Sequence, residues 1–202
     1  MYARLPSFIL GFHGCDRGVG ESILAGQAEL RPSKNDYDWL GSGSYFWENN
    51  PERAMDYATM LAAMKRKSAS AIREPFVLGA IIDLGRCLNL LDHRALAMLR
   101  QQYAELEQIF REAGLPLPIN AALRNSEDLV LRRLDRAVIE ALHTRRGKHG
   151  EPPYDSVRGV FFEGRELYPQ AGFRERNHIQ ICVRNQACIL GYFRPRGGLL
   201  VT

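Results

Sequence analysis

Closely spaced metal ligands and long apolar runs are both missing from this sequence of 202 residues. The four cysteines, Cys15, Cys87, Cys182 and Cys188, form no CxxC pair or Cys/His ligand spacing, which argues against a metal site and a secreted disulfide framework. No apolar run approaches the length of a membrane span, and segment 1–10 is too short and too weakly charged for a signal peptide. These absences favour a cytoplasmic protein with no membrane partner.

Composition gives a broad class. Hydrophobic residues make up 46% of the chain and charged residues 25%, values typical of a globular protein, and the length suits a single domain over residues 1–202. The net charge of +4 is concentrated in three basic clusters, 65–67, 145–148 and 194–196. Such clusters suit a nucleic-acid partner. A simpler interpretation of these basic clusters is that they lie at solvent-exposed helix ends, because Lys and Arg are favoured near helix C-termini.

The sequence predicts strands near both ends of the chain and helices between them. Apolar stretches predict an early strand over 5–13, followed by a loop at Gly14, and a central strand over 76–84. A glycine-rich loop over 34–43 leads into the aromatic strand 44–47. The last strands are expected over 157–162, 178–183 and 188–193. This order argues for an α+β fold.

Helical signals lie between these strands. A short helix is expected over 21–25, ended by Gly26, and a capped helix from Asn49-Asn50-Pro51 to about Lys67. Residues 92–146 form a helical region: one helix begins at Asp92, and a second is expected over 126–144. We interpret 92–146 as a helical insertion in the domain, followed by a surface loop over 147–155.

One group of residues is suited to binding a flat ring. His13-Gly14 follows a strand, Tyr45 enters another behind Gly41-Ser42-Gly43, and Tyr57 lies on the next helix. Two tyrosines can stack on the two faces of such a ring. Gly14 has no Cβ, so its backbone N–H and C=O can approach a ligand closely.

These residues resemble the ADP-ribosyltransferases of the diphtheria-toxin and poly(ADP-ribose) polymerase branch, which carry a His-Tyr-Glu signature. Phe12-His13-Gly14 matches the first element and the segment 41–46 the second. The resemblance implies a split β-sheet with flanking helices and NAD as co-substrate. It also implies roles: His13 bonds the nicotinamide ribose, the Gly14 backbone holds the carboxamide, and Tyr45 and Tyr57 sandwich the nicotinamide.

Two further residues enter the expected NAD site, and the third signature element differs. Ala54 falls where the family places a small residue, and Asn35 contacts the adenosine side or only makes a turn. The late strand 178–183 carries no acid. His178 is the closest positional match to the family's glutamate, whereas Gln180 has an amide oxygen that can accept a ribose hydroxyl, and we favour Gln180.

The resemblance therefore implies an NAD-dependent mono-ADP-ribosyltransferase. A neutral residue in place of the glutamate predicts transfer of a single unit. The acceptor is a protein or a nucleic acid, and the size suggests a bacterial toxin or phage-defence effector with a possible antitoxin. Two alternatives stay open: a catalytically weak or inactive module that binds NAD or ADP-ribose, and a basic nucleic-acid-binding protein.

Overall fold

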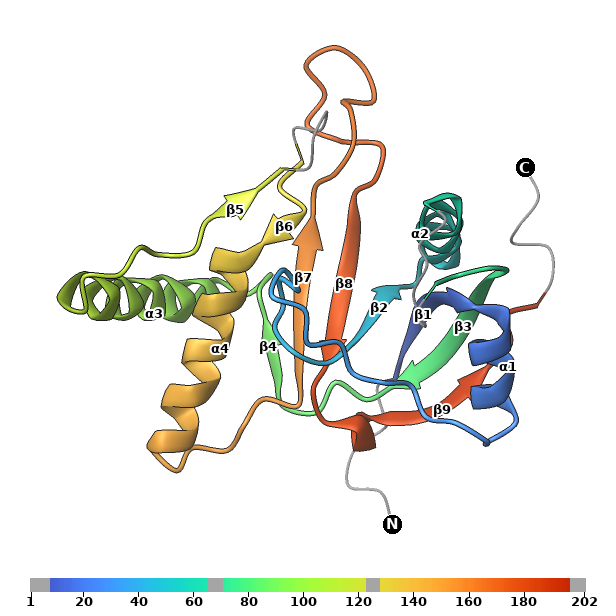
Figure 1. The fold of residues 1–202 in the computed structure, drawn as a ribbon, viewed down its shortest axis with the longest axis horizontal. Coiled ribbons are helices and arrows are strands. Elements are labelled where there is room, and N and C mark those ends of the chain that lie inside the picture. The colour runs from blue at the N-terminus through green and yellow to red at the C-terminus, as the bar shows by residue number, and fades with distance from the viewer. Residues whose placement is uncertain (1–7, 65–70, 123–127, 197–202) are drawn as a thin grey trace.

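A computed structural model describes residues 8–64, 71–122 and 128–196. Its centre is a seven-stranded sheet in the order β4-β7-β8-β2-β1-β3-β9, in which only the β4–β7 pair is parallel (Figure 1). Helices accompany this mostly antiparallel sheet, which confirms the α+β class. The strands are β1 Ile9–Asp16, β2 Ser44–Glu48, β3 Pro75–Ile82, β4 Cys87–Asn89, β7 Ser156–Phe161, β8 His178–Val183 and β9 Ile189–Phe193.

Four α-helices are described, and three of them begin behind a capping side chain. Asp16, Asn50 and Asp92 each accept a hydrogen bond from a backbone N–H in the first turn of the helix that follows. These bonds satisfy donors that a helix leaves free at its start. The helices are α1 Arg17–Leu24, α2 Pro51–Ala63, α3 His93–Glu112 and α4 Arg133–Lys148.

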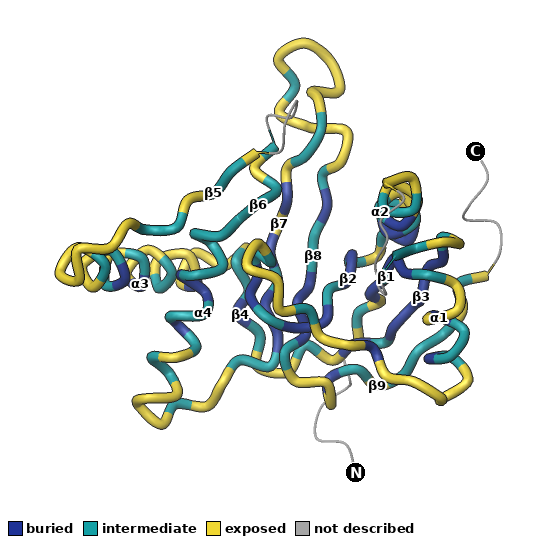
Figure 2. Tube along the Cα trace, viewed as in Figure 1, coloured by how far each residue is buried: buried dark blue, intermediate teal, exposed yellow. Residues whose placement is uncertain are grey.

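The two faces of the sheet have different coverings (Figure 2). On one face, which we call the α1 face, Phe46 and Leu78 pack against Ile23 of α1. On the other, the α2 face, α2 packs on β1 and β2, while α3 and α4 pack on β7 and β8. Alternation along each strand therefore decides which side chains meet which helices.

Strand β1 is longer at its C-terminal end than expected. It continues through Gly14 to Asp16, where a loop was predicted, because β3 pairs with it residue by residue as far as Pro75. Asp16 then caps α1, which begins at Arg17 rather than Glu21. The expected end of this helix is close to the observed one, with Gly26 at a φ of +70°.

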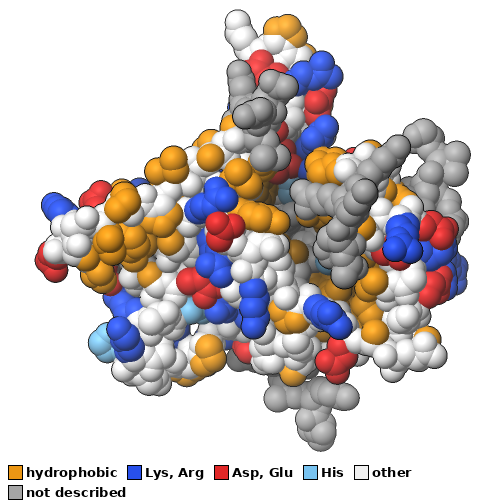
Figure 3. All heavy atoms as spheres, viewed as in Figure 1, with side chains coloured by type: hydrophobic (Ala, Val, Ile, Leu, Met, Phe, Trp, Pro, Cys, Tyr) orange, Lys and Arg blue, Asp and Glu red, His pale blue; other side chains and the backbone are white. Residues whose placement is uncertain are grey.

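The region 92–146, interpreted above as a helical insertion, contains a pair of short strands in addition to the helices α3 and α4. The second helix was expected from Ser126, but α4 begins at Arg133, and the preceding chain forms β6 Leu131–Arg132, paired with β5 Asn120–Ala121. Ser126 lies outside the described residues. A helix that begins at Ser126 and a short strand followed by a helix predict the same local apolar spacing. Only the pairing of β6 with β5 distinguishes the two. Apolar side chains remain exposed over α3 (Figure 3).

Other boundaries follow the sequence more closely. Strands β3, β7, β8 and β9 lie within two residues of their expected limits, and the short strand β4 was not expected. The helix α2 is described to Ala63, and the lysines expected at its end lie outside the described residues. None of the described helices is both long and apolar enough to cross a bilayer.

Candidate functional site

Strand β1 is paired very differently on its two sides. With β3 it forms eight residue pairs, from Ile9↔Ile82 to Asp16↔Pro75. With β2 it forms two, Gly11↔Glu48 and Phe12↔Trp47. Continued, this register would place His13 opposite Phe46 and Gly14 opposite Tyr45, but neither pair forms. The sheet is therefore open between β1 and β2 from His13 onward.

The backbone of Gly14 faces this opening. The Leu10 carbonyl accepts a hydrogen bond from Asn49 N–H at 2.9 Å, so it points toward β2. Backbone groups two residues apart point the same way in a strand, and the N–H and C=O of Gly14 therefore point toward β2 as well. The two strands form no residue pair at this position, although Gly14 itself is buried.

His13 reaches across the opening with its side chain. Its Nδ1 lies 2.8 Å from the carbonyl oxygen of Tyr45, an atom that only accepts hydrogen bonds, so Nδ1 carries the proton. Burial lowers the pKa of the imidazole, although the bond to Tyr45 opposes this. At neutral pH the ring is therefore neutral, and Nε2 has a free lone pair that can accept a hydroxyl.

Tyr45 is held by its hydroxyl group. The phenol donates to the carbonyl of Gly41 at 2.7 Å and accepts from the N–H of Leu40 at 3.0 Å. Burial raises the pKa of this phenol, so it stays protonated. The ring packs on the α2 face near Leu40, whereas His13 packs on the α1 face beside Phe46, with ring centroids 5.9 Å apart. A ligand that contacts both the Tyr45 ring and the His13 ring would therefore have to pass between β1 and β2, where the two strands are not paired.

Tyr57 lies on α2, on the same face as Tyr45. Its ring packs against Trp47, with centroids 5.0 Å apart and planes at 48°. Trp47 is two residues from Tyr45 along β2, so its side chain lies on the same face of the sheet. A third aromatic ring therefore lies on the face that carries the two tyrosines expected to sandwich the nicotinamide.

Ala54 has a different role from the one expected. It is 0% exposed, and its carbonyl oxygen would lie 2.2 Å from a Cβ placed on Gly14. Small residues at both positions let α2 pack directly on β1. This packing role is different from the expected contact with NAD, which stays a prediction.

Asn35 makes a turn. Its backbone N–H and its side-chain amide both bond the carboxylate of Asp38, and the amide also donates to Ser33 Oγ at 2.8 Å. These local bonds are those of a polar turn. Of the two roles expected for Asn35, the turn is the one its contacts support.

Gln180 uses its amide oxygen within the protein. The Oε1 accepts a hydrogen bond from Trp39 Nε1 at 2.7 Å, and Trp39 in turn packs edge-on against Phe161, with centroids 3.9 Å apart. Trp39 is a large aromatic residue in an otherwise polar, turn-rich loop, and the sequence analysis did not identify it as part of the site. Gln180 therefore holds Trp39 over β7 and β8.

His178 begins β8 and lies on the same face as Gln180, as strand alternation predicted. It is 7% exposed, stacks on Phe161 with planes at 6°, and has its Nδ1 2.7 Å from the Arg176 carbonyl. Burial lowers its pKa, opposed by that bond. The ring is neutral, with the proton on Nδ1.

A buried ion pair next to His178 was not expected. Arg53 Nη2 bonds Glu163 Oε2 at 2.6 Å, and both side chains are mostly buried. Glu163 follows β7 directly, and its carbonyl accepts a bond from Arg176 N–H, which places it beside the start of β8. Glu163 is conspicuous in the sequence only as an acid near the late strands. Its pairing with α2 depends on the fold.

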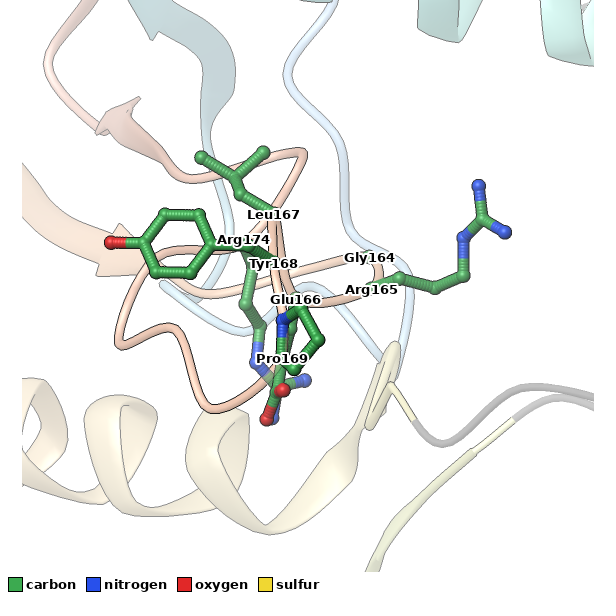
Figure 4. Close-up of a pocket in the computed structure, with 7 residues that line it drawn as sticks. All are labelled: Gly164, Arg165, Glu166, Leu167, Tyr168, Pro169 and Arg174. Atoms are coloured by element: carbon green, nitrogen blue, oxygen red, sulfur yellow. The ribbon is translucent and has the colours of Figure 1, made fainter.

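The segment between β7 and β8 forms a projecting hairpin. It encloses a shallow hollow of about 520 Å³ (Figure 4). Arg165 extends away from this hollow, while Leu167, Tyr168 and Phe173 are exposed along the hairpin. The residues that line the hollow are Gly164, Arg165, Glu166, Leu167, Tyr168, Pro169 and Arg174.

Within the described residues, no group of three or more His, Cys, Asp or Glu side chains is placed to hold a metal ion. The four cysteines are free thiols. Comparison with known proteins gave no assignment: no family model matches the chain, and neither the curated proteins nor the solved structures include a significant match.

Proposed function

We propose that this chain is an NAD-dependent mono-ADP-ribosyltransferase. The observation that carries the proposal is the opening between β1 and β2, where Gly14 forms no pair with β2 and His13 bonds the Tyr45 carbonyl. A carboxamide needs one acceptor and one donor side by side, and a strand with a missing neighbour offers both. The neutral His13 adds an acceptor for a hydroxyl on the opposite face.

The proposed reaction requires mainly positioning. The bond between ribose C1′ and the nicotinamide nitrogen breaks, and the nicotinamide leaves as a neutral molecule with the bonding electrons. A nucleophilic atom of the acceptor bonds C1′ and releases its proton. Because nicotinamide is a good leaving group, holding it between aromatic rings and orienting C1′ toward the acceptor provides much of the acceleration.

The test is release of nicotinamide together with transfer of label. The purified chain is incubated with NAD labelled in the adenylate part and with bacterial protein, RNA and DNA in separate reactions, followed by mass spectrometry. We expect label on one acceptor class. His13→Ala is expected to reduce nicotinamide release about 100-fold or more. His149→Ala, at an exposed histidine, is the matched control. If the intact chain neither labels an acceptor nor releases nicotinamide, the proposal is refuted.

A module that binds NAD without turnover is the second candidate. It is favoured by the absence of a carboxylate on β8, since His178 and Gln180 are both neutral there. Calorimetric binding of NAD without nicotinamide release in any mixture would support it over the enzyme. Toxin activity and control by an antitoxin rest on the family resemblance and stay part of the proposal.

Nucleic acid is less favoured as a simple binding partner. The basic residues of α4 are mostly paired with acids: Arg133 with Asp36, Arg145 with Glu105, and Arg146 with Glu151. Paired arginines contribute less to phosphate binding than free ones. RNA or DNA remains in the proposal as an acceptor, which the labelling reactions distinguish.

A further inference from the structure

Unsatisfied polar atoms collect where β8 begins. Three buried side-chain nitrogens, Trp47 Nε1, Arg53 Nε and His178 Nε2, have no hydrogen-bond partner in the described part of the chain. Trp47 is 4% exposed and His178 is 7% exposed. Their rings are 6.2 Å apart, and the Arg53 guanidinium lies 5.8 Å from the Trp47 ring. Buried polar groups without partners are uncommon and call for an explanation.

The three atoms are chemically complementary. The N–H groups of Trp47 and Arg53 can only donate. His178 donates its Nδ1 proton to the Arg176 carbonyl, so its Nε2 can only accept. A group that both donates and accepts satisfies such a set, and a hydroxyl is the smallest organic group that does so.

A carboxylate completes the cluster. Glu163 is held 2.6 Å from Arg53, and its charge acts on the His178 ring. A buried ion pair is seldom more stabilising than apolar residues of the same size. Its presence beside unsatisfied nitrogens therefore favours a role in binding or chemistry over a purely structural one.

The cluster also adjoins the opening in the sheet. Trp47 pairs with Phe12, the last β1–β2 pair before the opening, and its side chain is on the same face as Tyr45, about 7 Å away along β2. A ligand held at Gly14 and Tyr45 can thus reach the cluster without crossing the sheet.

We propose that Trp47, Arg53, Glu163 and His178 form the sugar-binding subsite of this protein. His178 Nε2 accepts a hydroxyl proton of the ribose that carries the nicotinamide, and Trp47 Nε1 donates to the same hydroxyl oxygen. Glu163 lies in the segment that follows β7 and is positioned by Arg53. It supplies the negative charge that β8 lacks. Gln180 holds Trp39 and does not contact the sugar. This inference rests on the proposed function.

The hydroxyl contact is tested with NAD and its analogues lacking the 2′- or the 3′-hydroxyl of that ribose. Calorimetry gives the affinity of each, whether or not turnover occurs. The wild-type chain is expected to prefer NAD over one analogue about tenfold, the value of one hydrogen bond. His178→Phe, which keeps the stacking on Phe161, and Trp47→Phe should reduce the preference to below about threefold, and His178→Gln should partly restore it. His149→Phe is the matched control.

The charge contribution is tested by Glu163→Gln. We expect kcat for nicotinamide release to fall about 100-fold while KM changes less than about threefold, because the charge matters most as C1′ becomes positive. Two results would overturn the inference and leave the proposed function standing, provided that the wild-type chain binds NAD. In the first, the preference for NAD over the deoxy analogue survives His178→Phe. In the second, that preference is lost only in Gln180→Met. Absence of NAD binding by the wild-type chain would overturn both.

Discussion

The two halves of the sheet are built differently. The half formed by β1, β3 and β9 has long ladders and an apolar filling, in which Leu78 and Ile82 are fully buried. The half formed by β4, β7, β8 and β2 contains buried charges, such as the Arg158–Glu48 pair, in which Arg158 Nη2 lies 2.8 Å from Glu48 Oε1. Only two residue pairs join β1 to β2. Side-chain packing must therefore contribute much of what holds the two halves together.

The largest effect is expected where a side chain of one half enters the core of the other. Phe46 on β2 is 0% exposed and packs with Leu78 and Ile82 of β3. Phe46→Ala is expected to reduce the free energy of unfolding by about 4 kcal/mol. Urea denaturation measures the change, and Phe162→Ala, at a side chain 55% exposed, is expected to cost less than about 1 kcal/mol. Equal losses would mean that Phe46 does not join the halves.

Gly14 tests the contact between β1 and α2. A Cβ there would lie 2.2 Å from the Ala54 carbonyl oxygen, so Gly14→Ala is expected to destabilise the fold by about 3 kcal/mol. Gly172→Ala, where nothing lies within 4 Å, is the matched control. Thermal unfolding distinguishes them, and a stable Gly14→Ala variant would show that α2 can move away from β1.

Acid is expected to weaken the charged half first. Burial, followed by the charge of Arg184, lowers the pKa of His143 on α4 to about 4. The unfolded chain, with an ordinary histidine pKa of about 6.5, binds the proton more readily. The stability contribution is therefore complete above pH ~6.5 and is lost as the pH falls toward 4, by up to about 3 kcal/mol.

His143→Leu should flatten this pH dependence, measured as the free energy of unfolding between pH 7 and pH 4. His149→Leu, at an exposed position, should leave it unchanged. Hydrogen exchange at pH 5 gives the location: β7 and β8 are expected to lose protection before β1 and β3. Simultaneous loss in both halves would contradict the comparison.

The smallest effect is expected in the loop before β2. Asn35 bonds only Ser33 and Asp38 in its turn, so Asn35→Ala is expected to cost less than about 1 kcal/mol and to leave NAD affinity within about twofold. Calorimetry measures that affinity. A larger loss of affinity would restore Asn35 to the binding site.

Much of the fold was predictable where local signals are strong. Asn50 and Asp92 cap their helices as their positions before apolar-periodic segments suggested, and β8 has the limits expected from alternation. The extension of β1 through Gly14 was not predictable, because glycine and a following Asp favour a turn unless a partner strand such as β3 pairs with them. The start of α4 was missed for the same reason, since β6 exists only through its pairing with β5.

By itself the sequence determined that His13 and Tyr45 lie on early strands and that Tyr57 lies on the helix that follows. That these residues contact one ligand stays a prediction. Only the tertiary structure decided that the pairing of β1 with β2 ends at Phe12, that Trp47 packs on Tyr57, and that Glu163 lies beside His178. The reason is physical. Strand alternation and helix capping act over a few residues, whereas pairing between strands and ion pairs such as Arg53–Glu163, 110 residues apart, form only when the whole sheet assembles.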